Sequence, residues 1–186
     1  MHRMKKFVNK STLKLVYNAL ISPHLNYSLL CWGFSIQRLH KIQKKAIRVI
    51  CMSKYNAHTE PLFKSLNLLN VSDIFKINTL KFVYKYHKGL LPDYFNGMFD
   101  FEETSHNYNT RHQNVRIPQP KRSSNNNSLR YFVPNLLGNI PECITDKLFT
   151  HSIQGFNQYV KKYLIEKYET QCLIRDCYIC GNGVVA

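Results

Sequence analysis

With 186 residues, the chain is long enough for one ordinary domain, or for one domain and a tail. Apolar residues make up 44% of it, which excludes a disordered composition and allows a buried core. The charge is one-sided, since 26 Lys and Arg oppose 11 Asp and Glu and give a formal net charge of +15. Such an excess favours a polyanionic partner, and a generic basic protein kept in solution by its charge is the alternative.

Helical spacing of apolar residues predicts three helices in the first third of the chain. The first begins at a cap formed by Ser11 or Thr12, and Pro23 ends or kinks it. A second helix follows and stops at Gly33. The third, over about residues 36–52, has the clearest amphipathic pattern. The residues expected on its buried face are Leu39, Ile42, Ala46 and Val49.

The other face of this third helix is basic. The first acidic residue of the chain is Glu60, so the eleven Lys and Arg before it have no acidic residue among them. Like charges three and four residues apart form a stripe that suits a phosphate backbone, and a merely solvated face is the alternative. The residues predicted to bind nucleic acid here are Lys41, Lys44, Lys45 and Arg48.

Residues 15–37 carry no charge and are long enough to span a bilayer. Their centre holds Pro23, His24 and Asn26, a helix breaker and two polar side chains, so we expect no membrane contact. No secretory signal is recognisable at the N-terminus. The six cysteines are therefore expected to be reduced thiols, and the protein to be intracellular, in the nucleus or the cytoplasm.

Further helices are predicted downstream. Thr59 precedes a short helix at residues 61–66, and Ser72 caps a longer one that ends at Gly89. A last helix covers about residues 144–168. No pair of strands joined by a hairpin turn is evident. The sequence therefore predicts an all-α fold, a small helical bundle with a long irregular basic loop and a flexible C-terminal tail.

These elements divide the chain into four expected segments. They are a helical thumb-like region (1–98), an irregular basic loop (99–141), a C-terminal helix (142–170) and a cysteine-containing tail (171–186). The loop is free of acidic residues from residue 104 to 141 and is rich in Asn, Ser and Pro. Its residues predicted to bind nucleic acid are Arg111, Arg116 and Arg122.

Several segments, taken in order, resemble one protein family. Together they resemble the region downstream of the palm in non-LTR (LINE-type, jockey- and CR1-like) retrotransposon reverse transcriptases, its thumb and the part that follows. The resemblance covers about residues 11–168, and the order and spacing of the segments carry it. The segments are residues 15–27, Cys31-Trp32-Gly33, residues 39–50, residues 59–63, residues 88–92 and residues 107–111.

The resemblance implies a fragment of an RNA-directed DNA polymerase without its catalytic palm. Such enzymes hold two metal ions with palm carboxylates, including an adjacent Asp pair. All five aspartates here stand apart, so we expect no catalytic residue and no activity of the chain on its own, with the palm lying before Met1. The expected partners are template or primer RNA or DNA and the remainder of the reverse transcriptase. The alternatives are a non-enzymatic helical interaction protein with an acidic partner, and a decayed transposon copy with no selected role.

The tail contains three cysteines in a C-x4-C-x2-C pattern, Cys172, Cys177 and Cys180. A closed structural zinc site needs four ligands, and residues 181–186 contain neither His nor Cys. A fourth ligand would come from Cys143, from His151 or from sequence beyond residue 186. We expect no cofactor and three ordinary thiols, and zinc is the alternative.

Overall fold

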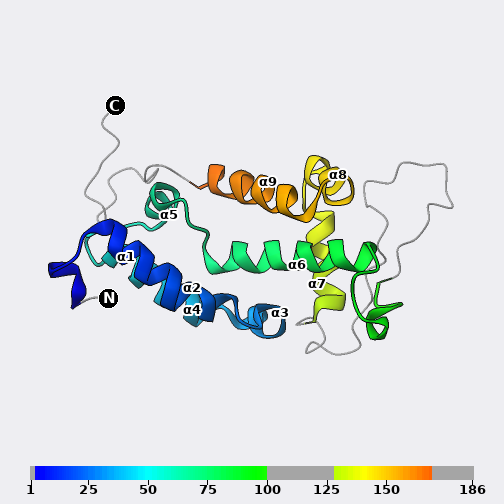
Figure 1. Ribbon diagram of the computed structural model, residues 1–186, viewed down its shortest axis with the longest axis horizontal. Coiled ribbons are helices and arrows are strands. Elements are labelled where there is room, and N and C mark those ends of the chain that lie inside the picture. The colour runs from blue at the N-terminus through cyan, green and yellow to red at the C-terminus, as the bar shows by residue number, and fades with distance from the viewer. Residues whose placement is uncertain (1–2, 100–127, 169–186) are drawn as a thin grey trace. The chain divides into compact units, whose positions relative to one another are not determined.

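The computed structural model describes residues 3–99 and 128–168, which form helices and, over these two ranges, no β-strand (Figure 1). The predicted all-α fold is confirmed. Its contacts group the chain into two compact units. Unit 1 comprises the described residues up to Phe75 and those from Lys161 onward, and unit 2 comprises Lys76–Val160. Both boundaries fall inside a helix, and no feature of the sequence marks them.

The helices of unit 1 precede those of unit 2 along the chain, and two helices belong to both units. Unit 1 contains α1 (Lys10–Val16), α2 (Ser22–Asn26), α3 (Leu29–Trp32), α4 (Gln37–Ile50) and α5 (Glu60–Leu66). The shared helices are α6 (Val71–His87) and α9 (Ile153–Glu166), and unit 2 adds α7 (Leu129–Gly138) and α8 (Glu142–Thr150). Short 3-10 turns lie at Met4–Lys6, Gly33–Ser35 and Asp93–Phe95.

The first helical segment begins and continues differently from expectation. Asn9 caps α1, because its side-chain oxygen accepts a hydrogen bond from the Thr12 backbone N–H at 2.8 Å, so neither Ser11 nor Thr12 is the cap. Pro23 does not end the helix, since it lies in the first turn of α2. A π-helical turn at Tyr17–Ile21 joins α1 to α2. Pro23 thus lies at a helix start, where its lack of a backbone N–H costs no hydrogen bond within the helix.

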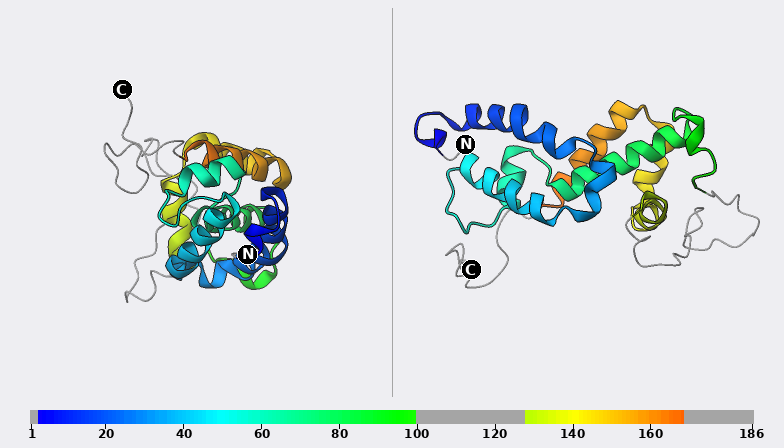
Figure 2. Two further views of the ribbon diagram at one scale, coloured as in Figure 1. Left: turned by 90° about the vertical axis from the view of Figure 1, so that its left-hand side faces the viewer. Right: turned by 90° about the horizontal axis from the view of Figure 1, so that it is seen from below.

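Helix α4 lies beside α1 in unit 1 (Figure 2), and its buried face differs from the predicted one. Ile42 was expected in the core and is 55% exposed, whereas Gln43 is fully buried. The buried face is therefore turned toward Gln43, because this amide finds partners that an apolar pattern does not reveal. The core residues around it are Leu13, Tyr17, Leu25, Ala46, Ile47, Ile50, Phe63, Leu66, Ile165 and Tyr168.

Gln43 of α4 joins the π-helical turn at Tyr17–Ile21 to the start of α6. Its Nε2 donates to the Tyr17 hydroxyl at 2.8 Å and to the Leu69 carbonyl at 2.9 Å. Its Oε1 accepts from the Val71 backbone N–H at 2.8 Å. Burial raises the pKa of Tyr17, and the hydrogen bond from Gln43 opposes this only in part. One side chain thus provides hydrogen-bond partners for three polar groups in unit 1, two of them buried and one half-buried.

A second polar cluster starts α6. Asn70 caps the helix by accepting from the Asp73 N–H at 2.9 Å, so the expected cap at Ser72 is wrong. The Tyr168 hydroxyl accepts from the Asn70 N–H at 3.1 Å and donates to the Asp73 carboxylate at 2.5 Å. Burial, followed by this bond to Asp73, raises the pKa of Tyr168. The end of α6 agrees with expectation, because Gly89 follows it with a φ of 63°, a left-handed conformation that glycine adopts without strain.

In unit 2 the chain after α6 folds back on that helix through aromatic rings. Phe82 packs edge-on against Phe95 and Phe99, with ring centroids 5.5 and 6.3 Å apart. Tyr86 packs in the same way on Phe99 at 5.0 Å, and its hydroxyl lies 3.3 Å from both the N–H and the carbonyl of Phe99. Such edge-to-face pairs stabilise the turn beyond the area they bury.

Helix α7 corrects the irregular loop expected over residues 99–141, because Leu129–Gly138 is helical. The Asn and Ser residues before this helix, together with Pro134, give the segment the composition of a loop. Pro134 lies inside the helix and removes one backbone hydrogen-bond donor. Burial of an apolar face outweighs that loss. The buried residues are Val133, Pro134, Leu136 and Leu137. Residues 100–127 of the expected loop lie outside the described residues.

The single helix expected between residues 142 and 170 is also corrected, because α8 and α9 are separate helices. Ser152 begins the second of them, since its hydroxyl accepts from the Gly155 N–H at 3.3 Å. Lys147 of α8 lies over the ring of Tyr159 of α9, 3.4 Å from its centroid, and this cation–π contact joins the two helices within unit 2.

Candidate nucleic-acid interface

Positive charge is concentrated in unit 1. Fifteen of its described residues are Lys or Arg and three are acidic, namely Glu60, Asp73 and Glu166. The described residues of unit 2 contain six Lys or Arg and three acidic residues. An attraction to polyanions is therefore expected mainly from unit 1.

The most regular group of exposed cations in unit 1 lies on α4. Its buried face leaves Arg38, Lys41 and Lys45 exposed on the opposite side, at spacings of three and four residues. Side chains at these spacings are neighbours on a helix surface. We call these three residues the α4 stripe. None of the described carboxylates forms an ion pair with them, so no acidic group in the described part of the chain directly offsets their mutual repulsion.

Arg48 would extend the stripe by helical spacing, but it has another role. Its side chain is half-buried, and its Nε donates to the Ala57 carbonyl at 2.8 Å. This bond ties the segment after α4 back onto the helix. Arg48 is therefore a structural anchor as well as a cation, and replacing it would disturb the fold.

Lys44 lies on the flank of α4, half-buried near His40. Burial, together with the positive charge of Lys44, lowers the pKa of His40, while the carboxylates of Asp73 and Glu60 act in the opposite direction. Asp73 and Glu60 thus lie near enough to His40 to act on it at this flank of α4.

The lowered pKa of His40 predicts a pH dependence of stability. At a pH below 6.5, the ordinary pKa of histidine, His40 binds a proton more readily in the unfolded chain than in the folded one. The free energy of unfolding therefore falls as the pH drops. We expect His40→Gln to lose less stability than the unaltered protein between pH 7 and pH 5.5, as measured by urea unfolding. His24→Gln is the control, because His24 is exposed. An equal loss in His40→Gln and in the unaltered protein would contradict this assignment.

Of the basic residues predicted as a site, Lys41 and Lys45 lie exposed on the stripe, and Lys44 and Arg48 lie half-buried. Sequence reasoning missed Arg38, although its spacing of three residues before Lys41 was a usable signal. The predicted contacts of the basic loop, Arg111, Arg116 and Arg122, lie outside the described residues, as do Cys172, Cys177 and Cys180.

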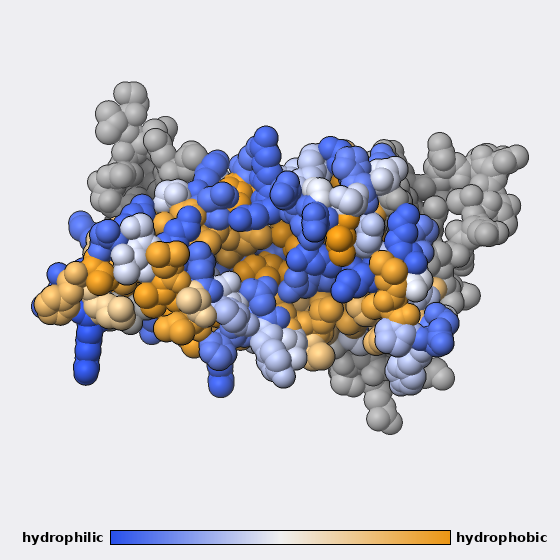
Figure 3. Space-filling view, viewed as in Figure 1, coloured by the Kyte–Doolittle hydropathy of each residue, from blue (hydrophilic) through white to orange (hydrophobic). Residues whose placement is uncertain are grey.

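The surface over α1 and α2 has a different character. Hydrophobic residues are exposed there (Figure 3), Leu15 and Leu20 among them. No charged residue occurs between Leu15 and Gln37. From Leu15 onward this face therefore offers no cation, unlike α4.

Between residues 3 and 99 and between residues 128 and 168, no helix combines the length and the apolar character needed to cross a membrane. In the same ranges, no three His, Cys, Asp or Glu side chains are grouped as metal ligands would be.

No family model, curated protein or solved structure matches this chain. The features that bear on its function are the α4 stripe, the charge of unit 1 and the resemblance of its segments.

Proposed function

We propose that this chain binds RNA or DNA along α4, as the thumb-like carboxy-terminal region of a non-LTR retrotransposon reverse transcriptase. The α4 stripe is the observation that carries the proposal. Arg38, Lys41 and Lys45 form an exposed line of cations on a helix that contains no acidic residue. A polyanion laid along this line replaces the repulsion between the three side chains by attraction to each of them.

The dimensions of the stripe fit a nucleic-acid backbone. From Arg38 to Lys45 it extends about 10 Å along the helix axis, at about 1.5 Å per residue. One strand places a phosphate about every 3.4 Å along a duplex axis, so the stripe spans about three nucleotides. Contacts of this kind supply affinity and orientation without reading the base sequence.

The proposed contribution to polymerisation is binding and not catalysis. The chain contains no adjacent pair of aspartates, the arrangement by which the palm of a reverse transcriptase holds its catalytic metal ions. In the proposal, the palm belongs to the remainder of the reverse transcriptase, and unit 1 holds template or primer. Arg111, Arg116 and Arg122 remain predicted as a second group of contacts.

The test is a triple variant, Arg38→Gln with Lys41→Gln and Lys45→Gln. All three side chains are exposed, so the fold should persist. We expect weaker binding of labelled RNA and DNA of any sequence, and a decrease of about two to three in the slope of log affinity against log salt, since three phosphate contacts are lost. Fluorescence anisotropy over a series of salt concentrations measures both.

The matched control removes the same positive charge from unit 2, with Lys85→Gln, Lys88→Gln and Arg130→Gln, which are also exposed. It should retain most of the affinity and slope. Equal losses in both triple variants would assign binding to net charge alone, and an unchanged α4 variant would move the contacts away from α4. No binding of nucleic acid by the unaltered chain, combined with binding of polyglutamate, would instead support the acidic protein partner.

A further inference from the structure

The segment that follows α4 contains an ordered turn. The Ala57 N–H donates to the Lys54 carbonyl at 3.1 Å, which closes a four-residue turn with Tyr55 and Asn56 at its central positions. Just before it, the Ser53 N–H donates to the Arg48 carbonyl at 3.0 Å. The Arg48 side chain then binds the Ala57 carbonyl at 2.8 Å. The turn is thus held to α4 at both of its ends.

The position of Arg48 places this turn on the same side of α4 as the stripe. Arg48 comes three residues after Lys45 and seven after Lys41, so it continues the outward face of the helix. It is half-buried because the turn covers it. The turn therefore lies at the carboxy-terminal end of the stripe, where a strand that follows the cations would leave α4.

Tyr55 projects from this turn into solvent. It is 79% exposed, and its neighbour Lys54 is exposed as well. A tyrosine on a tethered turn has only two side-chain torsions left to order, so it provides a nearly prepared flat surface. A groove or line of cations next to exposed aromatic rings is the arrangement by which proteins hold unpaired nucleotides, with phosphates on the cations and bases on the rings.

We propose that Tyr55 stacks on an unpaired base, so that α4 and this turn bind single-stranded nucleic acid in preference to a duplex. The proposal rests on the proposed function of the α4 stripe and adds the class of substrate. In a duplex the bases already stack on each other and present only their edges, so the ring gains little from them. In a single strand each base has a free face for the ring.

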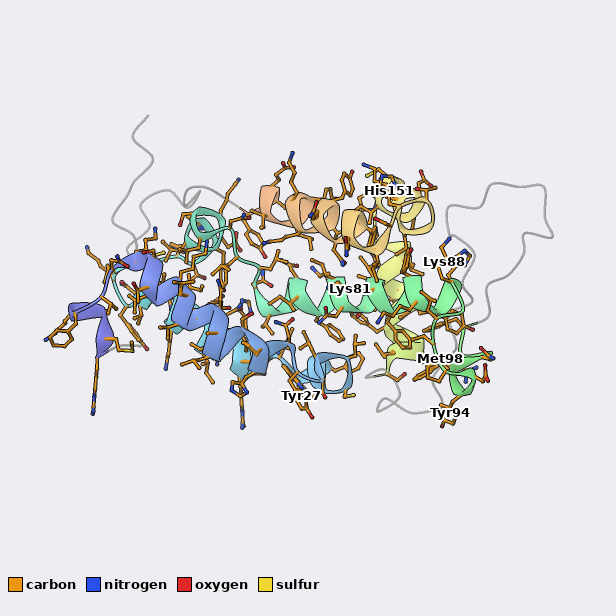
Figure 4. The ribbon with its side chains drawn as sticks, viewed as in Figure 1. Tyr27, Lys81, Lys88, Tyr94, Met98 and His151 are labelled. Carbon is orange, nitrogen blue, oxygen red and sulfur yellow. The ribbon has the colours of Figure 1, made fainter. Side chains whose placement is uncertain are left out.

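The test compares Tyr55→Ala and Tyr55→Phe in binding a labelled oligouridylate and a long duplex RNA. We expect Tyr55→Ala to weaken oligouridylate binding about tenfold, because one base loses the ring on which it stacks, and to leave duplex binding unchanged. Tyr55→Phe keeps the ring and should bind as the unaltered protein does. Tyr94→Ala is the control, since Tyr94 is 93% exposed in unit 2 and points away from the helices (Figure 4).

The outcomes separate this proposal from the previous one. Weaker binding by the α4 triple variant, with full oligouridylate binding by Tyr55→Ala, would keep the phosphate contacts and overturn the stacking. Equal losses on single strand and duplex, or a loss in Tyr55→Phe as large as in Tyr55→Ala, would also overturn it. A chain that binds neither nucleic acid would contradict the proposed function itself. Circular dichroism of each variant checks that the helices are retained.

Discussion

Replacing Gln43 with Ala is expected to lower the free energy of unfolding by about 4 kcal/mol, because two buried polar groups and one half-buried carbonyl lose their partner at about 1–3 kcal/mol each. The groups are the Tyr17 hydroxyl, the Leu69 carbonyl and the Val71 N–H, all within 2.9 Å of the Gln43 amide. Gln43 is fully buried, so the shorter side chain also leaves a cavity in the core of unit 1.

Urea unfolding followed by tryptophan fluorescence measures this loss. The only tryptophan, Trp32, lies in unit 1, so the signal reports on the unit that contains Gln43. A decrease in the midpoint with an unchanged slope would indicate a change in stability and not in the compactness of either state. A loss below about 1 kcal/mol would contradict the assignment, because it would mean that other groups satisfy the three partners.

Two further variants separate the hydrogen bonds from the cavity. Gln43→Met fills most of the volume but offers neither the donor nor the acceptor of the amide, so it should recover only the cavity part of the loss. Adding Tyr17→Phe to Gln43→Met removes one of the unsatisfied groups. The double variant should therefore be more stable than the sum of the two single losses predicts, a coupling that a double-mutant cycle measures.

Gln43 also illustrates what the sequence did and did not predict about the fold. The all-α class and the approximate bounds of α4, α5 and α6 follow from helical spacing of apolar residues. The rotation of α4 does not, because the partners of Gln43, the Tyr17 hydroxyl and backbone groups at Leu69 and Val71, lie 26 to 28 residues away in the sequence. A pattern that assigns every polar residue to the surface places Gln43 outside and Ile42 in the core, whereas the structure has the reverse.

The predicted helix ends were wrong for a different reason, which lies in local chemistry. Asn9 and Asn70 are caps, and Ser152 separates two helices that were predicted as one. Asn and Ser have similar intrinsic preferences for this position, so spacing alone does not decide between neighbouring candidates.

The candidate site was predictable in composition but not in detail. Lys41 and Lys45 were expected to be exposed and are. The anchoring bond of Arg48 was not foreseeable, since it depends on how the turn at Lys54–Ala57 folds back. For the same reason Tyr55 gave no signal, because an aromatic residue outside a periodic pattern does not reveal whether it faces the core or the solvent.

Gly33 provides the second large expected effect. It ends α3 as predicted, but its φ is −62°, which any residue adopts, so backbone conformation does not require glycine here. The requirement comes from Phe75, because a Cβ added at Gly33 would lie 2.4 Å from the Phe75 Cδ2. Phe75 is buried and packs edge-on against Phe34 with ring centroids 5.2 Å apart, so its ring has little room to move.

Gly33→Ala is therefore expected to lower the free energy of unfolding by about 2–3 kcal/mol, the range typical of overpacking in a core. Gly138→Ala is the matched control, since a Cβ there meets no atom within 4 Å. Gly138 ends a helix, so this variant should be neutral or more stable by up to about 1 kcal/mol. Urea unfolding monitored by circular dichroism measures both.

A compensating change shows whether the clash with Phe75 is the cause. Phe75→Leu makes room at the site but loses apolar contact, so alone it should destabilise unit 1 by about 1 kcal/mol or somewhat more. Gly33→Ala should therefore cost less stability in the Phe75→Leu variant than in the unaltered protein, because the smaller side chain at position 75 accommodates the added methyl group. Additive losses would mean that Gly33 is needed for another reason, and the close approach of Phe75 would then not explain the glycine at this position.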